Sequence, residues 1–250
     1  VIVELGITSI AVPPLGCGHG GLRWSDVEPL IHEKLGGVDA EVLVYPPEGP
    51  PPASTMAREP TRPTMSVGKA ALVTLIDRYS PLALGATPIE VQKLMYFLQE
   101  AGQPLRLNYR KHLYGPYADN LRHVLNNVEG HFLQGYGDGS GRVLDAAPIE
   151  VLDGAAAEAA AVVATDPELR DRIDRVLALA DGFESAYGME LLATVHWAAT
   201  RAECEDRPCI IRTVRSWNRR KSRMFTSEHV NAALTQLERH GWVETERLAS

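Results

Sequence analysis

The sequence predicts an α+β protein, in which a predominantly helical domain with a few short strands follows a strand-loop-helix-strand segment of α/β type. Three observations predict this class. Two β-branched, apolar runs flank a helical pattern near the start, a proline-rich stretch follows them, and apolar residues recur at helical spacing through most of the remaining chain. We therefore expect an α/β segment at residues 1–47, a linker at 48–65 and a mainly helical domain at 66–250.

The α/β segment is defined by two short runs, residues 8–12 and 41–45, that each end in a pair of prolines. Between them, Ser25 and Glu28 fit a capping box, in which a hydroxyl and a carboxylate satisfy free backbone N–H groups at the start of a helix. Two glycines at 36–37 end that helix. The order strand, loop, helix, strand implies a parallel strand pair.

The helical domain is predicted from caps and apolar stripes. Thr87 and Glu90 form a capping box around Pro88 at the first helical position, and Asp166 precedes a second helix that starts with proline. The other elements expected here are helices at 118–128, 190–202 and 226–240 and short strands at 105–109 and 242–248.

The composition of the 250 residues allows a sizeable core, and no apolar run approaches the roughly 20 residues that cross a bilayer. Without such a run or a signal pattern, we expect a cytoplasmic protein with no membrane partner. An odd number of cysteines, three, argues against a disulfide framework and favours structural thiols in a reducing compartment. The first residues already have the pattern of a domain interior, which suggests a fragment cut within a domain.

Charge is unevenly distributed along the chain. The net charge of −7 disfavours nucleic-acid binding. Residues 138–206 hold 15 acidic and 5 basic side chains, whereas residues 207–225 hold 7 basic and no acidic ones. An acidic helical block is therefore followed by a basic run.

The glycine loop after the first strand contains a G-x-G-x-x-G pattern at Gly16, Gly18 and Gly21. Backbone N–H groups in such a loop, next to a helix start, can hold a diphosphate. A dinucleotide fold also requires an acidic residue at the end of the second strand. Tyr45 occupies that position, so the dinucleotide interpretation is weak.

The stretch SIAVPPLGCGHGG, together with the strand end VYPP, resembles the second half of a macrodomain, and among macrodomains the DarG family of DNA ADP-ribosyl glycohydrolase antitoxins. The resemblance implies that Tyr45 flanks the adenine of ADP-ribose. It implies that the diphosphate and distal ribose lie on the loop residues Gly16, Cys17, Gly18, His19, Gly20 and Gly21. The alternative is a glycine loop that is merely a tight turn.

The family's catalytic half has no counterpart in residues 1–47. Its loop of asparagine and aspartate and its catalytic lysine are missing, and Lys34, late in a helix, does not match that lysine. We therefore expect a truncated macrodomain that is not an enzyme, with no catalytic residues, although the full-length parent resembles a glycohydrolase. ADP-ribose is expected as a partner only of a complete macrodomain.

The remaining residues resemble the C-terminal region of the same family, which neutralises the toxin DarT, an enzyme that attaches ADP-ribose to thymidine in single-stranded DNA. KLMYFLQEAG and YGPYADNLRHVL also give a distant likeness to SocA-type antitoxin domains. Tyr114-Gly115-Pro116-Tyr117 is predicted as a turn in which the proline starts the next helix. Its two tyrosines either contact a partner or close the core.

Two hypotheses for the helical domain follow. In the leading one, it binds a DarT-like toxin and blocks the DNA or NAD site, with Asp166, Glu168, Asp171 and Asp174 imitating DNA phosphates. The simpler view of these carboxylates is a solvated helix face. Trp217 is a further candidate for contact with the toxin. In the alternative, the basic run 207–225, with Trp217 as a stacking ring, and the last helix form an autoregulatory nucleic-acid-binding module.

Other chemistry has little support in the sequence. The histidines and cysteines lack metal-ligand spacing, and we expect neither a metal nor a cofactor. His196 lies in an apolar helical pattern, so it is interpreted as a hydrogen-bonded core residue.

Overall fold

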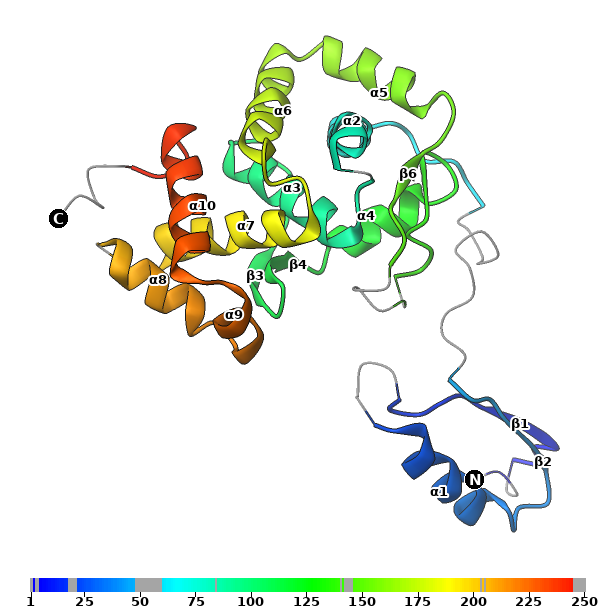
Figure 1. The fold of residues 1–250 in the computed structure, drawn as a ribbon. Helices are drawn as coiled ribbons and strands as arrows, with labels where there is room; N and C mark the ends of the chain where they lie inside the picture. Colours follow the sequence, from blue (N-terminus) through cyan, green and yellow to red (C-terminus); the bar gives the residue numbers. More distant parts are fainter. Residues whose placement is uncertain are drawn as a thin grey trace. The chain divides into compact units, whose positions relative to one another are not determined.

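The computed structural model describes residues 2, 5–17, 22–47, 60–83, 85–139, 141, 146–202, 204 and 206–244. The chain divides into two compact units, 1–50 and 51–250, and each is described by itself below (Figure 1). Within the described residues, no helix is long and apolar enough to cross a membrane. Both units combine helices with short strands, which confirms the predicted α+β class.

The first unit consists of β1 (Ser9–Val12), α1 (Trp24–Leu35) and β2 (Glu41–Val44). The two strands are parallel, with Ser9 opposite Glu41 and Val12 opposite Val44, as the element order predicts. Val12, Val27 and Ile31 form the buried centre, where one face of α1 covers the strand pair.

The start of α1 differs from the predicted capping box at Ser25. The helix begins at Trp24, and Arg23 occupies the cap position without a side-chain hydrogen bond to the backbone. The Arg23 guanidinium instead donates to both Asp26 carboxylate oxygens, at 2.9 and 3.2 Å. The predicted box was wrong because the helix starts before Ser25, which places that serine inside the first turn.

The second unit is mainly helical, and α7 packs against α3, α8, α10 and β4 near its centre (Figure 1). Its helices are α2 (Val67–Ala83), α3 (Pro88–Glu100), α4 (Leu121–Val128), α5 (Ala155–Ala164), α6 (Pro167–Ala180), α7 (Ala186–Arg201), α8 (Arg207–Arg215), α9 (Arg219–Met224) and α10 (Ser227–Arg239). Its strands are β3 (Tyr109–His112), β4 (Gly115–Ala118), β5 (Leu133–Gln134) and β6 (Glu150–Val151).

Two helices are buried around most of their circumference, and they organise this core. The residues from Ile89 to Leu98 in α3 are all buried, as are those from Gly188 to His196 in α7. Both helices therefore lie inside the unit, although each also buries polar side chains, whereas α6, with a one-sided apolar stripe, covers the core from outside.

Three predicted helix starts are confirmed. The Glu90 carboxylate accepts from the backbone N–H of Thr87 at 2.9 Å, and this completes the capping box of α3. Asp166 accepts from the backbone N–H of Leu169 at 3.0 Å, and Thr226 caps α10. Local cap chemistry therefore sets these boundaries.

The segment around Tyr114 to Tyr117 is not a turn that leads into a helix. Residues 109–112 and 115–118 form an antiparallel hairpin, and the next helix starts only at Leu121. The physical reason lies in α3, whose buried polar side chains hold β4. The Lys93 ammonium donates to the Pro116 carbonyl at 2.6 Å, and the Gln92 amide bonds both backbone groups of Ala118. The strand predicted at 105–109 is correspondingly shifted to 109–112.

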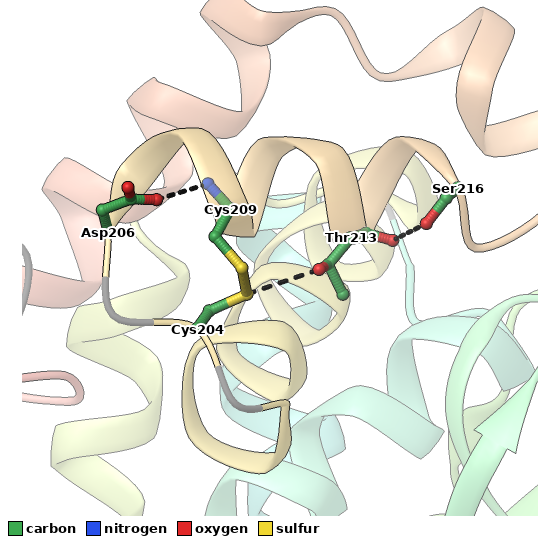
Figure 2. Close-up of a disulfide and its surroundings, with 5 residues drawn as sticks. All are labelled: Cys204, Asp206, Cys209, Thr213 and Ser216. Carbon is green, nitrogen blue, oxygen red and sulfur yellow. Dashed lines mark hydrogen bonds between the residues drawn. A yellow bond between two sulfur atoms is a disulfide. The ribbon is translucent and has the colours of Figure 1, made fainter.

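Cys204 and Cys209 form a disulfide, contrary to the expectation of free structural thiols (Figure 2). The connection from α7 to α8 reverses the chain and brings their Cα atoms to 5.4 Å, within the range that a disulfide spans. Asp206, between them, accepts from the Cys209 backbone N–H at 2.6 Å and caps α8. Cys17 remains a free thiol.

The end of the chain gives no strand in its described part. Gly241 has a φ of +66° and ends α10 as predicted. Residues 242–244, the start of the predicted edge strand, are not in a strand, and residues 245–248 lie outside the described residues. Trp242 packs into the helical core instead, with its ring 5.2 Å from that of Phe97.

Candidate functional site at the glycine loop and on the helical unit

The glycine loop and Tyr45 leave the strand pair at the same edge. Because β1 and β2 are parallel, their carboxyl ends lie side by side, and the Tyr45 backbone N–H donates to the Val12 carbonyl at 3.0 Å. The loop begins one residue later, at Pro13. Tyr45 is 53% exposed, so its ring is accessible at this edge.

The described part of the loop folds back on itself. Gly16 has a φ of +72°, and its carbonyl accepts from the Leu22 N–H at 3.0 Å. The positive φ favours glycine there, since other residues rarely adopt it. The Cys17 N–H donates to the Pro14 carbonyl at 3.1 Å. Gly18, His19, Gly20 and Gly21 lie outside the described residues.

This edge combines features that suit a nucleotide diphosphate. A helix start without a side-chain cap leaves backbone N–H groups available for an anion. The Arg23 guanidinium is paired with Asp26, but both side chains are exposed, so an anion here can exchange with that weak pair as well as use the backbone donors. The exposed Tyr45 ring supplies an aromatic face at the same edge.

The two predicted partner tyrosines occupy the hairpin and its turn. Tyr114 is half-buried, with the Arg220 guanidinium 4.9 Å from its ring centroid. The half-buried ring of Tyr117 lies 5.0 Å from that of His112, and burial, together with Asp119, raises its pKa. Both rings therefore keep one accessible part while contacting the unit.

The predicted acidic residues lie on α6 or at its start. Asp166 is occupied as the helix cap. The other three lie on the exposed side and are each paired with an arginine, as follows: Glu168 with Arg172 at 2.7 Å, Asp171 with Arg170 at 3.8 Å, and Asp174 with Arg78 at 2.6 Å. These exposed pairs are worth little to stability, so a cationic partner can exchange with them at small cost.

Trp217, expected to offer a ring for stacking, is only 8% exposed. Its indole N–H donates to the His112 carbonyl at 2.7 Å, and the Lys111 ammonium lies 4.6 Å from its ring centroid. The expectation of a stacking platform was wrong because the ring fills the space between the β3–β4 hairpin and the α8–α9 junction. Trp217 thus positions the hairpin that carries Tyr117.

No family model matches the chain, but individual relatives do. A DNA ADP-ribosyl glycohydrolase of Thermus aquaticus is 39% identical over 246 residues, which cover 98% of this chain and 67% of that protein. Proteins of the same name from Mycobacterium bovis and Mycobacterium tuberculosis are each 37% identical over 252 residues, with 95% of this chain and 70% of the relative covered. The chain belongs to the DNA ADP-ribosyl glycohydrolase family. A DNA ADP-ribosyl transferase-DNA ADP-ribosyl glycohydrolase fusion protein of Thermosipho africanus is also 52% identical over 42 residues, 17% of this chain and 11% of the fusion.

The expectation that the chain is not an enzyme is therefore wrong. It rested on motif residues missing from residues 1–47, whereas relatives named as a DNA ADP-ribosyl glycohydrolase match 95–98% of the chain. Similarity along both units carries more weight than a motif absent from one short segment.

Sequence reasoning missed a buried charged cluster in this glycohydrolase family member. Glu190 of α7 accepts from the Lys221 ammonium and, at 2.6 Å, from the Arg220 guanidinium of α9. Burial and the nearby Lys221 lower the pKa of Lys93 to about 7. Burial also lowers the pKa of Lys221 to about 8, against the opposing effect of Glu190. The available signal was a lysine and a glutamate inside otherwise apolar helical patterns.

This cluster joins α3, α7, α9 and the hairpin. Gly115 of β4 has a φ of +88°, and a β-carbon there would lie 2.8 Å from the Thr194 hydroxyl. The cluster is buried, so its role is to fix the hairpin and α9 on the core rather than to meet a ligand.

His196 is a core residue, as predicted. It is 3% exposed, and its Nδ1 lies 2.8 Å from the Tyr96 hydroxyl. Burial lowers its pKa to about 4, so it is neutral near pH 7. Among the described residues, no group of three metal-ligating side chains comes together.

Proposed function

We propose that this chain acts in the removal of ADP-ribose from DNA and that its helical unit binds and neutralises a DNA ADP-ribosyltransferase. The observation that carries the proposal is the extent of the match, since the Thermus aquaticus relative aligns with 98% of the chain and therefore with most of both units. The fusion relative, named for both activities, supports a functional link between transferase and glycohydrolase.

In the proposed ADP-ribose site, the loop from Gly16 receives the diphosphate on its backbone N–H groups, and Tyr45 packs against the adenine. Support comes from the shared edge of the strand pair, where the uncapped start of α1 and an exposed aromatic ring adjoin. The loop residues proposed to contact ADP-ribose are Gly16, Cys17, Gly18, His19, Gly20 and Gly21.

Substitution of Tyr45 tests this site. Tyr45→Ala should weaken ADP-ribose binding about 5- to 150-fold, the range that corresponds to the roughly 1–3 kcal/mol of a base stacked on an aromatic side chain. Leu30→Ala, on the exposed side of α1, is the control. Calorimetry measures binding, and release of ADP-ribose from a modified thymidine oligonucleotide measures activity. Equal affinity of both variants would refute the Tyr45 assignment, and no release by the unaltered chain would refute its glycohydrolase activity.

In the proposed toxin-binding role, the helical unit covers the DNA or NAD site of the transferase. Exposed carboxylates on α6 then meet cations that otherwise bind DNA phosphates, by exchange with their weak arginine pairs. The residues proposed for this contact are Tyr114, Tyr117, Glu168, Asp171 and Asp174, whereas Asp166 serves as the cap of α6 and Trp217 supports the hairpin.

Co-purification with an untagged transferase tests this role. Glu168→Gln combined with Asp171→Asn should weaken capture and flatten its salt dependence, because charge attraction is lost. Glu150→Gln combined with Glu228→Gln removes two exposed carboxylates elsewhere and should leave capture intact. Equal capture by both double variants would refute DNA mimicry through α6, and no capture by the unaltered chain would refute neutralisation.

A further inference from the structure

Two consecutive short helices at the edge of the helical unit carry exposed arginines on their outer side. Figure 1 shows α8 and α9 one after the other beside α7, and their inward positions are buried, including Ile210, Val214 and Phe225. The arginine face consists of the exposed residues Arg212, Arg215, Arg219 and Arg223.

The four arginines of this face lack the carboxylate partner that most of the other described arginines of the unit have. Among the residues that the structure describes, no carboxylate lies within ion-pair distance of these four guanidinium groups. Elsewhere in the unit arginines are regularly paired, as Arg62 is with Glu158 and Arg201 is with Glu100. Four exposed cations on two successive helices thus have no carboxylate partner within the described part of the chain.

The position of Arg219 is unfavourable for the helix itself. It is the first residue of α9, where the helix dipole disfavours a cation. Its neighbour Arg220 gains an ion pair with Glu190 in return, but Arg219 has no such contact in the described part of the chain. Helix stability therefore does not account for a cation here.

The β3–β4 hairpin adds a further cation next to this face. The Trp217 indole and the Asn218 amide donate to the backbone carbonyls of the hairpin at 2.7 and 3.0 Å, and this fixes the hairpin to the α8–α9 junction. Lys111 lies over the Trp217 ring and is itself exposed. The positive surface thus extends from two helices onto a strand.

We propose that the arginine face binds the phosphate backbone of single-stranded DNA. Guanidinium groups bind phosphates in a bidentate manner, and four of them along two successive helices can follow a chain of phosphodiesters. In the described part of α8 and α9 no large apolar side chain is exposed, so the surface lacks what an interfacial membrane helix requires. The inference rests on the proposed action on DNA and gives that function a second contact with its substrate, remote in sequence from the glycine loop.

A salt-dependent binding measurement tests this contact. The probe is an unmodified, fluorescein-labelled, thymidine-containing single-stranded oligonucleotide, and fluorescence anisotropy gives the Kd of the whole chain at several NaCl concentrations. Arg215→Gln combined with Arg219→Gln should lower the magnitude of the salt slope by about 1.4 and raise the Kd about 25-fold at 0.1 M NaCl, because each lost phosphate contact removes a slope of about 0.7.

The matched control is Arg62→Gln combined with Arg106→Gln, which changes the net charge equally at exposed positions elsewhere. Its Kd and salt slope should stay close to those of the unaltered chain, and both double variants should still capture the transferase. Equal DNA affinity of the two double variants would overturn the inference. So would loss of transferase capture by the arginine variant with DNA binding unchanged, since the face would then serve a protein partner. Neither result would bear on ADP-ribose release, which tests the proposed function separately.

Discussion

Reduction of the Cys204–Cys209 disulfide should destabilise the helical unit by a defined amount. The bond closes a loop with a sequence separation of five residues between α7 and α8. For a loop of this size, the lost conformational entropy of the unfolded chain corresponds to about 2 kcal/mol at 25 °C. The contact of the Cys204 sulfur with the Thr213 hydroxyl, at 3.4 Å, helps to hold the loop against α8 in the folded state (Figure 2).

Denaturant unfolding with and without a phosphine reductant measures this change, and thiol titration of the denatured chain verifies the bond. The sequence contains three cysteines, so one free thiol, Cys17, should titrate before reduction and three after it. The double variant Cys204→Ser and Cys209→Ser should be insensitive to reductant, whereas Cys17→Ser should behave like the unaltered chain. Three free thiols before reduction, or an unfolding free energy unaffected by reductant, would refute the reasoning.

Three further predictions concern buried His196, buried Glu190 and the close packing at Gly115. The pKa of His196 is lowered to about 4, below the unfolded value of about 6.5, so the unfolded chain binds the proton more readily. The contribution of neutral His196 to the free energy of unfolding is fully present above pH 6.5 and falls by about 3 kcal/mol as the pH drops to 4. Urea unfolding across that range measures this change. His196→Gln should reduce the dependence of the unfolding free energy on pH. Glu190→Gln leaves buried cations without a counter-charge and should cost about 3–5 kcal/mol in the same assay; a change below about 1 kcal/mol would contradict this account. Gly115→Ala should lower the melting temperature more than Gly154→Ala, because both have positive φ but only the first meets another atom, the Thr194 hydroxyl; equal shifts would show that crowding is unimportant.

Elements whose ends depend on local chemistry were predicted well in the helical unit, whereas the box predicted at Ser25 in the first unit was wrong. The box of Thr87 and Glu90, the cap at Asp166 and the last helix depend on hydrogen bonds between residues three positions apart, which a sequence displays directly. The parallel order of β1 and β2 likewise follows from short runs of apolar residues and the helix between them.

Elements that depend on distant partners were predicted poorly. The hairpin at 109–118 is held by Lys93 and Gln92 of α3, more than twenty residues away, and by Trp217, about a hundred residues away. Local turn chemistry around Pro116 pointed instead to a helix start, because it contains no information on these contacts.

The sequence by itself determined the class of the protein. It gave the two-part organisation and an ADP-ribose site at the glycine loop and Tyr45 only as hypotheses, the second through a family resemblance. Only the tertiary structure decided which charges are free. It pairs the α6 carboxylates with arginines and buries Trp217 and Lys221, and among the residues it describes it gives the arginine face no carboxylate partner. The physical reason is that ion pairing and burial depend on which surfaces meet in the fold, and charge counts along a chain do not contain that information.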